Sequence, residues 1–83
     1  MTAFRFSVSI MPRDGILDPQ GRAVETALPQ LGASTVHGVR VGRRVELTVE
    51  ATSEADARSV VERLAADFLA NPLVERWQIE AAA

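Results

Sequence analysis

The sequence has no cysteine, lysine or tyrosine and contains a single histidine. Without cysteine there can be no disulfide, no thiolate metal site and no thiol nucleophile. Without lysine there can be no Schiff base and no lysine general base. His37 alone cannot supply a histidine-rich metal site. Composition therefore removes most of the common catalytic and metal-binding groups from this 83-residue chain.

The chain also lacks a large charge of either sign and a long hydrophobic run. Its formal net charge is −2, which gives no electrostatic case for binding nucleic acid or an anionic membrane. The N-terminus has no basic stretch leading into an apolar core, and Arg5 interrupts its short apolar pattern. We therefore expect no signal peptide, no membrane span and a cytoplasmic location.

The length predicts one small domain, over residues 1–80, followed by a frayed tail at 81–83. A domain this short buries only roughly 60–65% of the surface that its unfolded chain exposes. Small domains usually compensate with disulfides, a metal or a partner. Since the first two are disfavoured here, the sequence predicts an oligomeric protein.

The N-terminal half predicts a strand followed by a helix. Residues 3–11 alternate apolar and polar side chains, which is typical of a half-buried strand. Asp18 and Pro19 form a helix start, with the aspartate as N-cap. Pro29 predicts a kink or an early end to this helix, and Gly32 suits the position just after it.

The second half predicts three strands and a helix. Segments 35–41 and 45–51 read as an antiparallel hairpin joined by Gly42-Arg43-Arg44. A helix then begins after Ser53, Asn71-Pro72 stops it, and a last strand covers 73–80. The order β-α-β-β-α-β predicts an α+β, ferredoxin-like fold with a four-stranded antiparallel sheet and two helices on one face. The other face would carry Arg5, Ser7, Ser9, Glu46, Thr48 and Glu50.

The pattern contains no recognisable catalytic, phosphate-binding or metal-binding motif. Glu46 and Glu50 would lie roughly 13 Å apart along a strand, too far to share a proton or a metal. Two features are not explained by folding alone. Gly21, in the first helical turn, either allows close approach of a backbone or ligand or reflects simple drift. The apolar turn 69–75 is either core or contact surface.

Three motifs, in order, resemble one known family. They are LDPQGRAV at 17–24, VHGVRVGR at 36–43 and FLANPLVE at 68–75. They resemble the PurS family, the small subunit of phosphoribosylformylglycinamidine (FGAM) synthase, a purine-biosynthesis ligase. This chain departs from the family pattern in a longer loop at Arg13-Asp14, in Arg43 where lysine is common, and in Pro29.

The resemblance implies a non-catalytic subunit of a glutamine-dependent, ATP-dependent C–N ligase. It would bridge a glutaminase subunit and a large synthetase subunit, help to shield the ammonia path, and itself form a dimer or tetramer. ATP and Mg²⁺ would be used by the synthetase, with no cofactor bound by this chain. The residues expected to contribute subunit contacts are Asp18, Gln20, Gly21, Arg22, Arg40, Gly42, Arg43, Asn71 and Pro72.

Two other functions stay open on the residues alone. An ACT-type regulatory module shares the predicted topology and binds small effectors at dimer interfaces, and only Asp14-Gly15 offers a matching loop after the first strand. Saturable amino-acid binding by the isolated chain would favour it. A free-standing enzyme would require turnover by the chain alone, for which no candidate site is visible.

Overall fold

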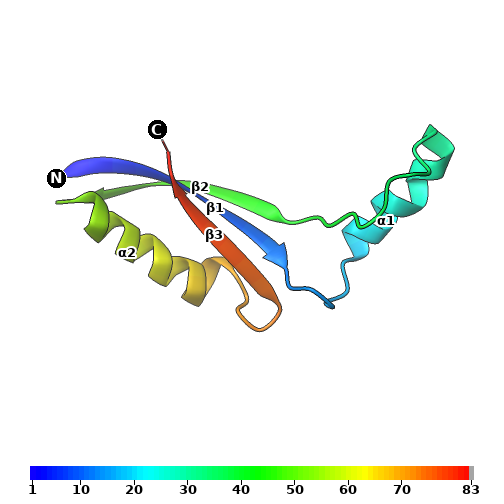
Figure 1. Cartoon of the computed structure of the whole chain (residues 1–83). Coiled ribbons are helices and arrows are strands. Elements are labelled where there is room, and N and C mark those ends of the chain that lie inside the picture. The colour runs from blue at the N-terminus through cyan, green and yellow to red at the C-terminus, as the bar shows by residue number, and fades with distance from the viewer. Residues whose placement is uncertain (83) are drawn as a thin grey trace.

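The computed structural model describes residues 1–82 and contains a three-stranded antiparallel sheet, one helix packed on it, and a second helix held away from it (Figure 1). The strands have the order β2-β1-β3. The elements, in chain order, are β1 (Thr2–Pro12), α1 (Pro19–Ala27), the 3-10 helix η1 (Leu28–Leu31), β2 (Arg43–Ala51), α2 (Glu54–Leu64), the π-helical turn η2 (Ala65–Leu69) and β3 (Glu75–Ala81).

The core lies between the central strand and α2. Phe6, Val8 and Ile10 of β1 are fully buried, as the alternating pattern predicts, and they face Ala57 and Val61 of α2. The alanine allows the helix axis to approach the sheet closely, so one short helix can cover these three large side chains. We call the sheet together with α2 and η2 the body.

Ser53 caps α2 as the sequence predicts, because its hydroxyl accepts a hydrogen bond from the Asp56 amide. The last strand extends one residue further than the sequence predicts. Ala81, where a frayed tail was predicted to begin, pairs with Phe6 in the sheet, and the Ala82 amide donates to the Arg5 carbonyl. Ala83 lies outside the described residues.

The first helix does not lie on the sheet. Figure 1 shows α1 and the segment that returns from it projecting from one end of the body, and we call residues 17–42 the arm. The chain measures 52 × 27 × 13 Å, with a radius of gyration of 16.4 Å. A compact domain of this length has a radius of gyration of roughly 12 Å. The prediction that two helices share one sheet face is therefore wrong for the single chain, whereas the α+β class and the antiparallel sheet are confirmed.

The predicted strand 35–41 is also absent from the sheet. Arg43 and Arg44, expected in a hairpin turn, already belong to β2, where they pair with Ile10 and Ser9. The chain therefore leaves the sheet in a straight line with no turn, and the 35–41 segment runs out along the arm. Its β-type pattern is present, but within residues 1–82 it finds no ladder partner.

Pro29 and Gly32 act as the sequence predicts. The α-helix ends at Ala27, and the proline lies in the tighter turn that follows. Gly32 adopts the left-handed conformation (φ 78°), and its amide donates to the carbonyls of the last turn. The tip of the arm is therefore a defined turn.

Among the described residues, the helices are too short and too polar to cross a membrane.

Candidate functional site at the arm root

Asp18 is the centre of the arm root, the junction at which the arm leaves the body. It caps α1, and its Oδ1 accepts a hydrogen bond of 3.0 Å from the Gly21 amide. Its Oδ2 accepts a second bond of 2.7 Å from the Val41 amide on the returning segment. Only 8% of Asp18 is exposed, yet both carboxylate oxygens are satisfied. One side chain thus starts the helix and ties it to the segment beside it.

Glu25 ties α1 to the returning segment further along the arm, and Arg40 ties that segment to the end of β1. Glu25 Oε1 accepts a 2.8 Å hydrogen bond from the Val39 amide. The carboxylates of Asp18 and Glu25 therefore accept hydrogen bonds from the amides of Val41 and Val39, two alternate residues of the returning segment. Arg40 Nη2 donates to the carbonyls of Pro12 and Arg13, at 3.4 and 3.0 Å, and Arg40 Nε lies 3.9 Å from Asp18 Oδ2. The arm is therefore a built unit fastened to the end of β1.

Two glycines are required by these close approaches. A side chain at Gly21 would place its Cβ against the Asp18 carboxylate and 2.5 Å from the Val39 carbonyl oxygen. A side chain at Gly42 would meet the Ile10 carbonyl and the Met11 sulfur. Real Cβ atoms do not approach backbone atoms so closely, which favours close approach over drift for Gly21. The approaching backbone is the chain's own.

An ion pair joins the arm root to the turn before β3. Both guanidinium Nη atoms of Arg43 bond to the two carboxylate oxygens of Glu75, and Nη2 also donates to the Leu69 carbonyl. Glu75 Oε1 in turn accepts a 2.7 Å bond from the Asn71 amide. This bidentate arrangement fixes the direction of both side chains.

Arg13 completes the junction. Its Nε donates to the Pro72 carbonyl at 3.0 Å, and its amide donates to the Val74 carbonyl at 2.8 Å. The loop after β1 and the turn before β3 are therefore held together, although 59 residues separate Arg13 from Pro72 in the chain.

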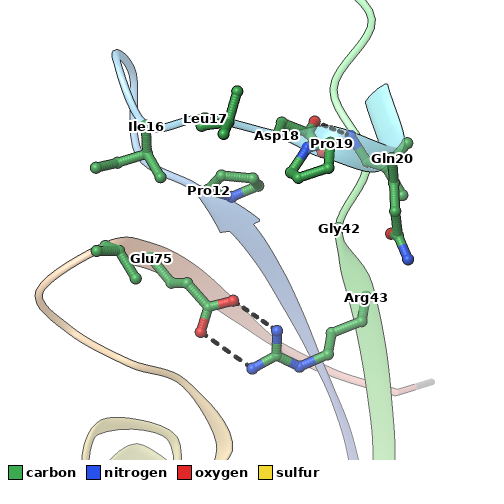
Figure 2. A pocket seen from close by; sticks show the side chains of 11 residues that line it. Pro12, Ile16, Leu17, Asp18, Pro19, Gln20, Gly42, Arg43 and Glu75 are labelled. Atoms are coloured by element: carbon green, nitrogen blue, oxygen red, sulfur yellow. Dashed lines mark hydrogen bonds and ion pairs between the residues drawn. The ribbon is translucent and has the colours of Figure 1, made fainter. Parts of the chain in front are cut away.

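An open cavity of about 540 Å³ lies between these elements. Figure 2 shows the prolines Pro12 and Pro19 on one side, the Arg43–Glu75 pair on another, and the Gln20 side chain extending towards Arg43. Nearby Leu17 is 67% exposed, and Leu73, in the turn before β3, is 85% exposed. The cavity thus has an apolar rim and a few polar groups, which is the composition of a contact surface for another protein.

Hydrogen bonding sets the charge state of the two acidic residues. Backbone amides of Gly21 and Val41 lower the pKa of Asp18 below its ordinary value of 3.8, against the opposing effect of burial. The Arg43 guanidinium and the Asn71 amide lower the pKa of Glu75, and Glu75 raises the pKa of Arg43. All three groups therefore stay charged at neutral pH.

The structure brings most of the predicted contact residues together. Asp18, Gly21, Arg40, Gly42 and Arg43 meet at the arm root, Gln20 lines its cavity, and Asn71 and Pro72 bond to it from the turn. Arg22 is exposed on α1 and does not line the cavity. That these residues contact other subunits stays a prediction.

Sequence reasoning missed Glu75, Glu25 and Arg13. Glu75 ends the third motif and its charge is opposite to that of Arg43, but nothing in the sequence places position 43 beside position 75. Glu25 lies within the predicted first helix and Arg13 in the loop after the first strand, and no motif marks either residue. In residues 1–82 no three His, Asp or Glu side chains cluster as metal ligands would.

Comparison with known proteins gives a consistent match. The family model described as PurS, phosphoribosylformylglycinamidine (FGAM) synthase, matches residues 5–83. The PurS subunit from Mycobacterium leprae is 40% identical over 75 residues, which cover 90% of this chain and 91% of the relative. The corresponding subunit from Synechocystis is 36% identical over 78 residues, covering 94% of this chain and 78% of the relative.

Solved structures agree in fold. The structure of PurLQS from Thermotoga maritima contains a chain that superposes with a TM-score of 0.90 at 28% identity, covering 99% of this chain and 100% of that one. Thermus thermophilus PurS superposes with a TM-score of 0.81 at 33% identity, covering 99% and 100%. The extended shape, arm included, is thus shared with these proteins.

Proposed function

The chain belongs to the PurS family and is a subunit of FGAM synthase in purine biosynthesis, and from this we propose that it joins the glutaminase and synthetase subunits without carrying out their chemistry. The observation that carries the proposal is the likeness of the whole chain to one component of the Thermotoga maritima PurLQS assembly. In this proposal, only the synthetase subunit binds and uses ATP and Mg²⁺. The assembly works in the cytoplasm.

The shape of the chain supports a bridging role. A molecule 52 Å long and only 13 Å thick has a large surface relative to its volume, and much of that surface is free to contact other proteins. Five of its exposed large apolar side chains lie in two parts of the chain that are far apart in sequence. One set lies on the arm, with Val24 (44% exposed), Leu31 (76%) and Val36 (48%), and the other lies near the turn before β3, with Phe68 (80%) and Leu73 (85%). Two separated apolar surfaces can contact two different proteins.

The arm root is the part that we assign to subunit contact. It has an apolar rim, its polar groups have fixed directions, and the Gln20 carboxamide is exposed beside them. Fixed polar groups give orientation, and the apolar rim gives area. A neighbouring subunit seated here would also shield a path for ammonia from solvent. We further propose that the chain associates with itself, as a dimer or tetramer.

Reconstitution tests the proposal directly. The purified chain is mixed with glutaminase and synthetase subunits from the same organism, and glutamine-dependent ligase activity is measured with and without it. We expect co-elution of the three proteins and loss of glutamine-dependent activity, but not of ammonia-dependent activity, when the chain is omitted. Full glutamine-dependent activity without the chain, and no co-elution, would overturn the proposal. Saturable amino-acid binding by the chain alone would instead support a regulatory module.

A further inference from the structure

The cavity at the arm root exposes its hydrogen-bond donors and covers its carboxylates. Asp18 and Glu75 are the acidic residues that line it, and their side chains are only 7% and 18% exposed. The Arg43 side chain is 50% exposed, and Gln20 is exposed on α1. Figure 2 shows the Gln20 side chain extending towards the guanidinium. The polar surface that an approaching molecule meets is therefore mainly that of Arg43 and Gln20.

The carboxylates of this cavity already have partners. Both oxygens of Asp18 accept hydrogen bonds from backbone amides, and Arg40 lies beside one of them. Both oxygens of Glu75 bond to Arg43, and Oε1 also accepts from the Asn71 amide. Each negative charge thus has an arginine next to it. A ligand that brings only donors or a positive charge would therefore gain little here.

The donors of the cavity are only partly used. Within residues 1–82, Arg43 makes two hydrogen bonds to Glu75 and one to the Leu69 carbonyl, which leaves two of the five guanidinium N–H groups free. The Gln20 carboxamide forms no hydrogen bond with another described residue, and its amide group can donate twice. The polar groups that remain free in the cavity are therefore mainly donors.

The charge and the rim of the cavity narrow the choice of ligand further. Three arginines, Arg13, Arg40 and Arg43, meet two carboxylates at the arm root, which leaves an excess of positive charge. A carboxylate brings acceptor oxygens and a negative charge, and it forms strong charge-assisted hydrogen bonds with arginine. Ile16 and Leu17 lie on the rim, and Leu17 is largely exposed. A small free acid would leave this apolar rim in water.

We propose that the arm-root cavity receives an aspartate or glutamate side chain of a partner subunit, with an apolar residue beside it in the same loop. This rests on the subunit role proposed above and names the chemistry that the contact recognises. The carboxylate would accept from Gln20 and from the free N–H groups of Arg43, and its apolar neighbour would cover Leu17. Because Glu75 already holds the guanidinium in place, little side-chain freedom would be lost on binding.

Opposite charges at position 20 test the sign of the partner group. Gln20→Glu and Gln20→Lys both remove the carboxamide. We expect the dissociation constant for the partner subunit, measured by titration calorimetry, to be at least about tenfold larger for the glutamate variant than for the lysine variant. Gln30→Glu and Gln30→Lys, at the exposed tip of the arm, are the matched controls and should differ by less than about twofold.

Folding effects at position 20 run in the opposite direction. The first turn of a helix favours glutamate over lysine, because the N-terminus of a helix is its positive end. The glutamate variant should therefore fold at least as stably as the lysine variant while it binds more weakly. Urea denaturation of the two variants separates the two effects.

The lack of lysine allows the contact to be identified directly. In Gln20→Lys the introduced amine is the only side-chain amine of the chain. A carbodiimide condenses an amine with a carboxylate that touches it, and the reagent takes up the water that is lost. We expect a cross-link from position 20 to an aspartate or glutamate of one partner subunit, located by mass spectrometry. Gln30→Lys should give a yield at least about tenfold lower.

Other results overturn the proposal. A glutamate variant that binds as tightly as the lysine variant, or more tightly, would show that the partner group is neutral or basic. A cross-link only within the chain, or only to a second copy of it, would place position 20 outside the contact with other subunits. Saturable binding of free glutamate, weakened by Gln20→Glu, would assign the cavity to a small acid instead.

These results are distinguishable from a failure of the subunit role. If the unaltered chain restores glutamine-dependent activity while position 20 gives any of them, the subunit role stands and the carboxylate contact falls. If the unaltered chain binds neither subunit in the calorimeter, the subunit role itself falls.

Discussion

The body and the arm are stabilised by different means. In the body, large apolar side chains from β1 are fully buried under the small side chains of α2. In the arm, the only buried residues are Asp18 and Gly21, and the contacts are hydrogen bonds from backbone amides to carboxylates. Burial of apolar area is non-directional, whereas these hydrogen bonds fix an orientation. The body therefore supplies stability, and the arm supplies geometry.

The largest expected effect comes from the body. Phe6→Ala removes the largest fully buried side chain and should cost about 3–5 kcal/mol of unfolding free energy. Urea denaturation followed by circular dichroism measures it. Leu31→Ala, an exposed apolar residue of the arm, is the matched control and should change the unfolding free energy by less than about 0.5 kcal/mol. Similar losses for both variants would mean that the arm contributes to stability as much as the body does.

The next effect separates assembly from folding. Gly21→Val forces α1 away from the Val39 carbonyl and should weaken binding to the partner subunits by about tenfold or more, equivalent to about 1.4 kcal/mol. The unfolding midpoint should move little, because the body does not contact this residue. Ala23→Val, on the exposed surface of the same helix, should leave binding unchanged. Collapse of thermal stability, with normal assembly of the folded remainder, would contradict this assignment.

Acid should loosen the arm root before the core. The pKa values of Asp18 and Glu75 are lowered by folding, so their stabilising contribution is complete above their ordinary values of 3.8 and 4.5. It is lost as pH falls through the lower folded values. Amide exchange at Val41, corrected for the intrinsic rate, should lose protection below about pH 4 while Val8 stays protected. In Asp18→Asn the protection at Val41 should already be low at pH 7.

The smallest effect concerns the ion pair at the surface. Glu75→Gln should cost less than about 1 kcal/mol of unfolding free energy, because half of the Arg43 side chain is in solvent. The same variant should reduce subunit binding more than it reduces stability, since Glu75 orients Arg43 beside the cavity. Titration calorimetry with the partner subunits and urea denaturation compare the two losses. Glu62→Gln, on the exposed surface of α2, is the control.

The sequence predicts the parts of this molecule that depend on local signals. The alternation in β1, the Asp18 and Ser53 caps and the end of α1 before Pro29 all follow from neighbouring residues, and all are confirmed. The position of the arm could not be predicted, because it depends on whether Arg43 joins the turn or the strand, and both fit the local pattern. The Arg43–Glu75 contact joins residues 32 positions apart and has no local signature.

Gly42, the residue at which the arm joins β2, also fixes the length of the chain at this point. Odd-numbered side chains share one side from Val39 to Val49, so the arm and the strand are in phase across Gly42. One inserted residue would turn every arm side chain to the opposite side, and two would give the chain enough slack to close its own hairpin. The tip near Gly32 carries no such restriction. Length variation should therefore be tolerated at the tip of the arm and excluded at its base.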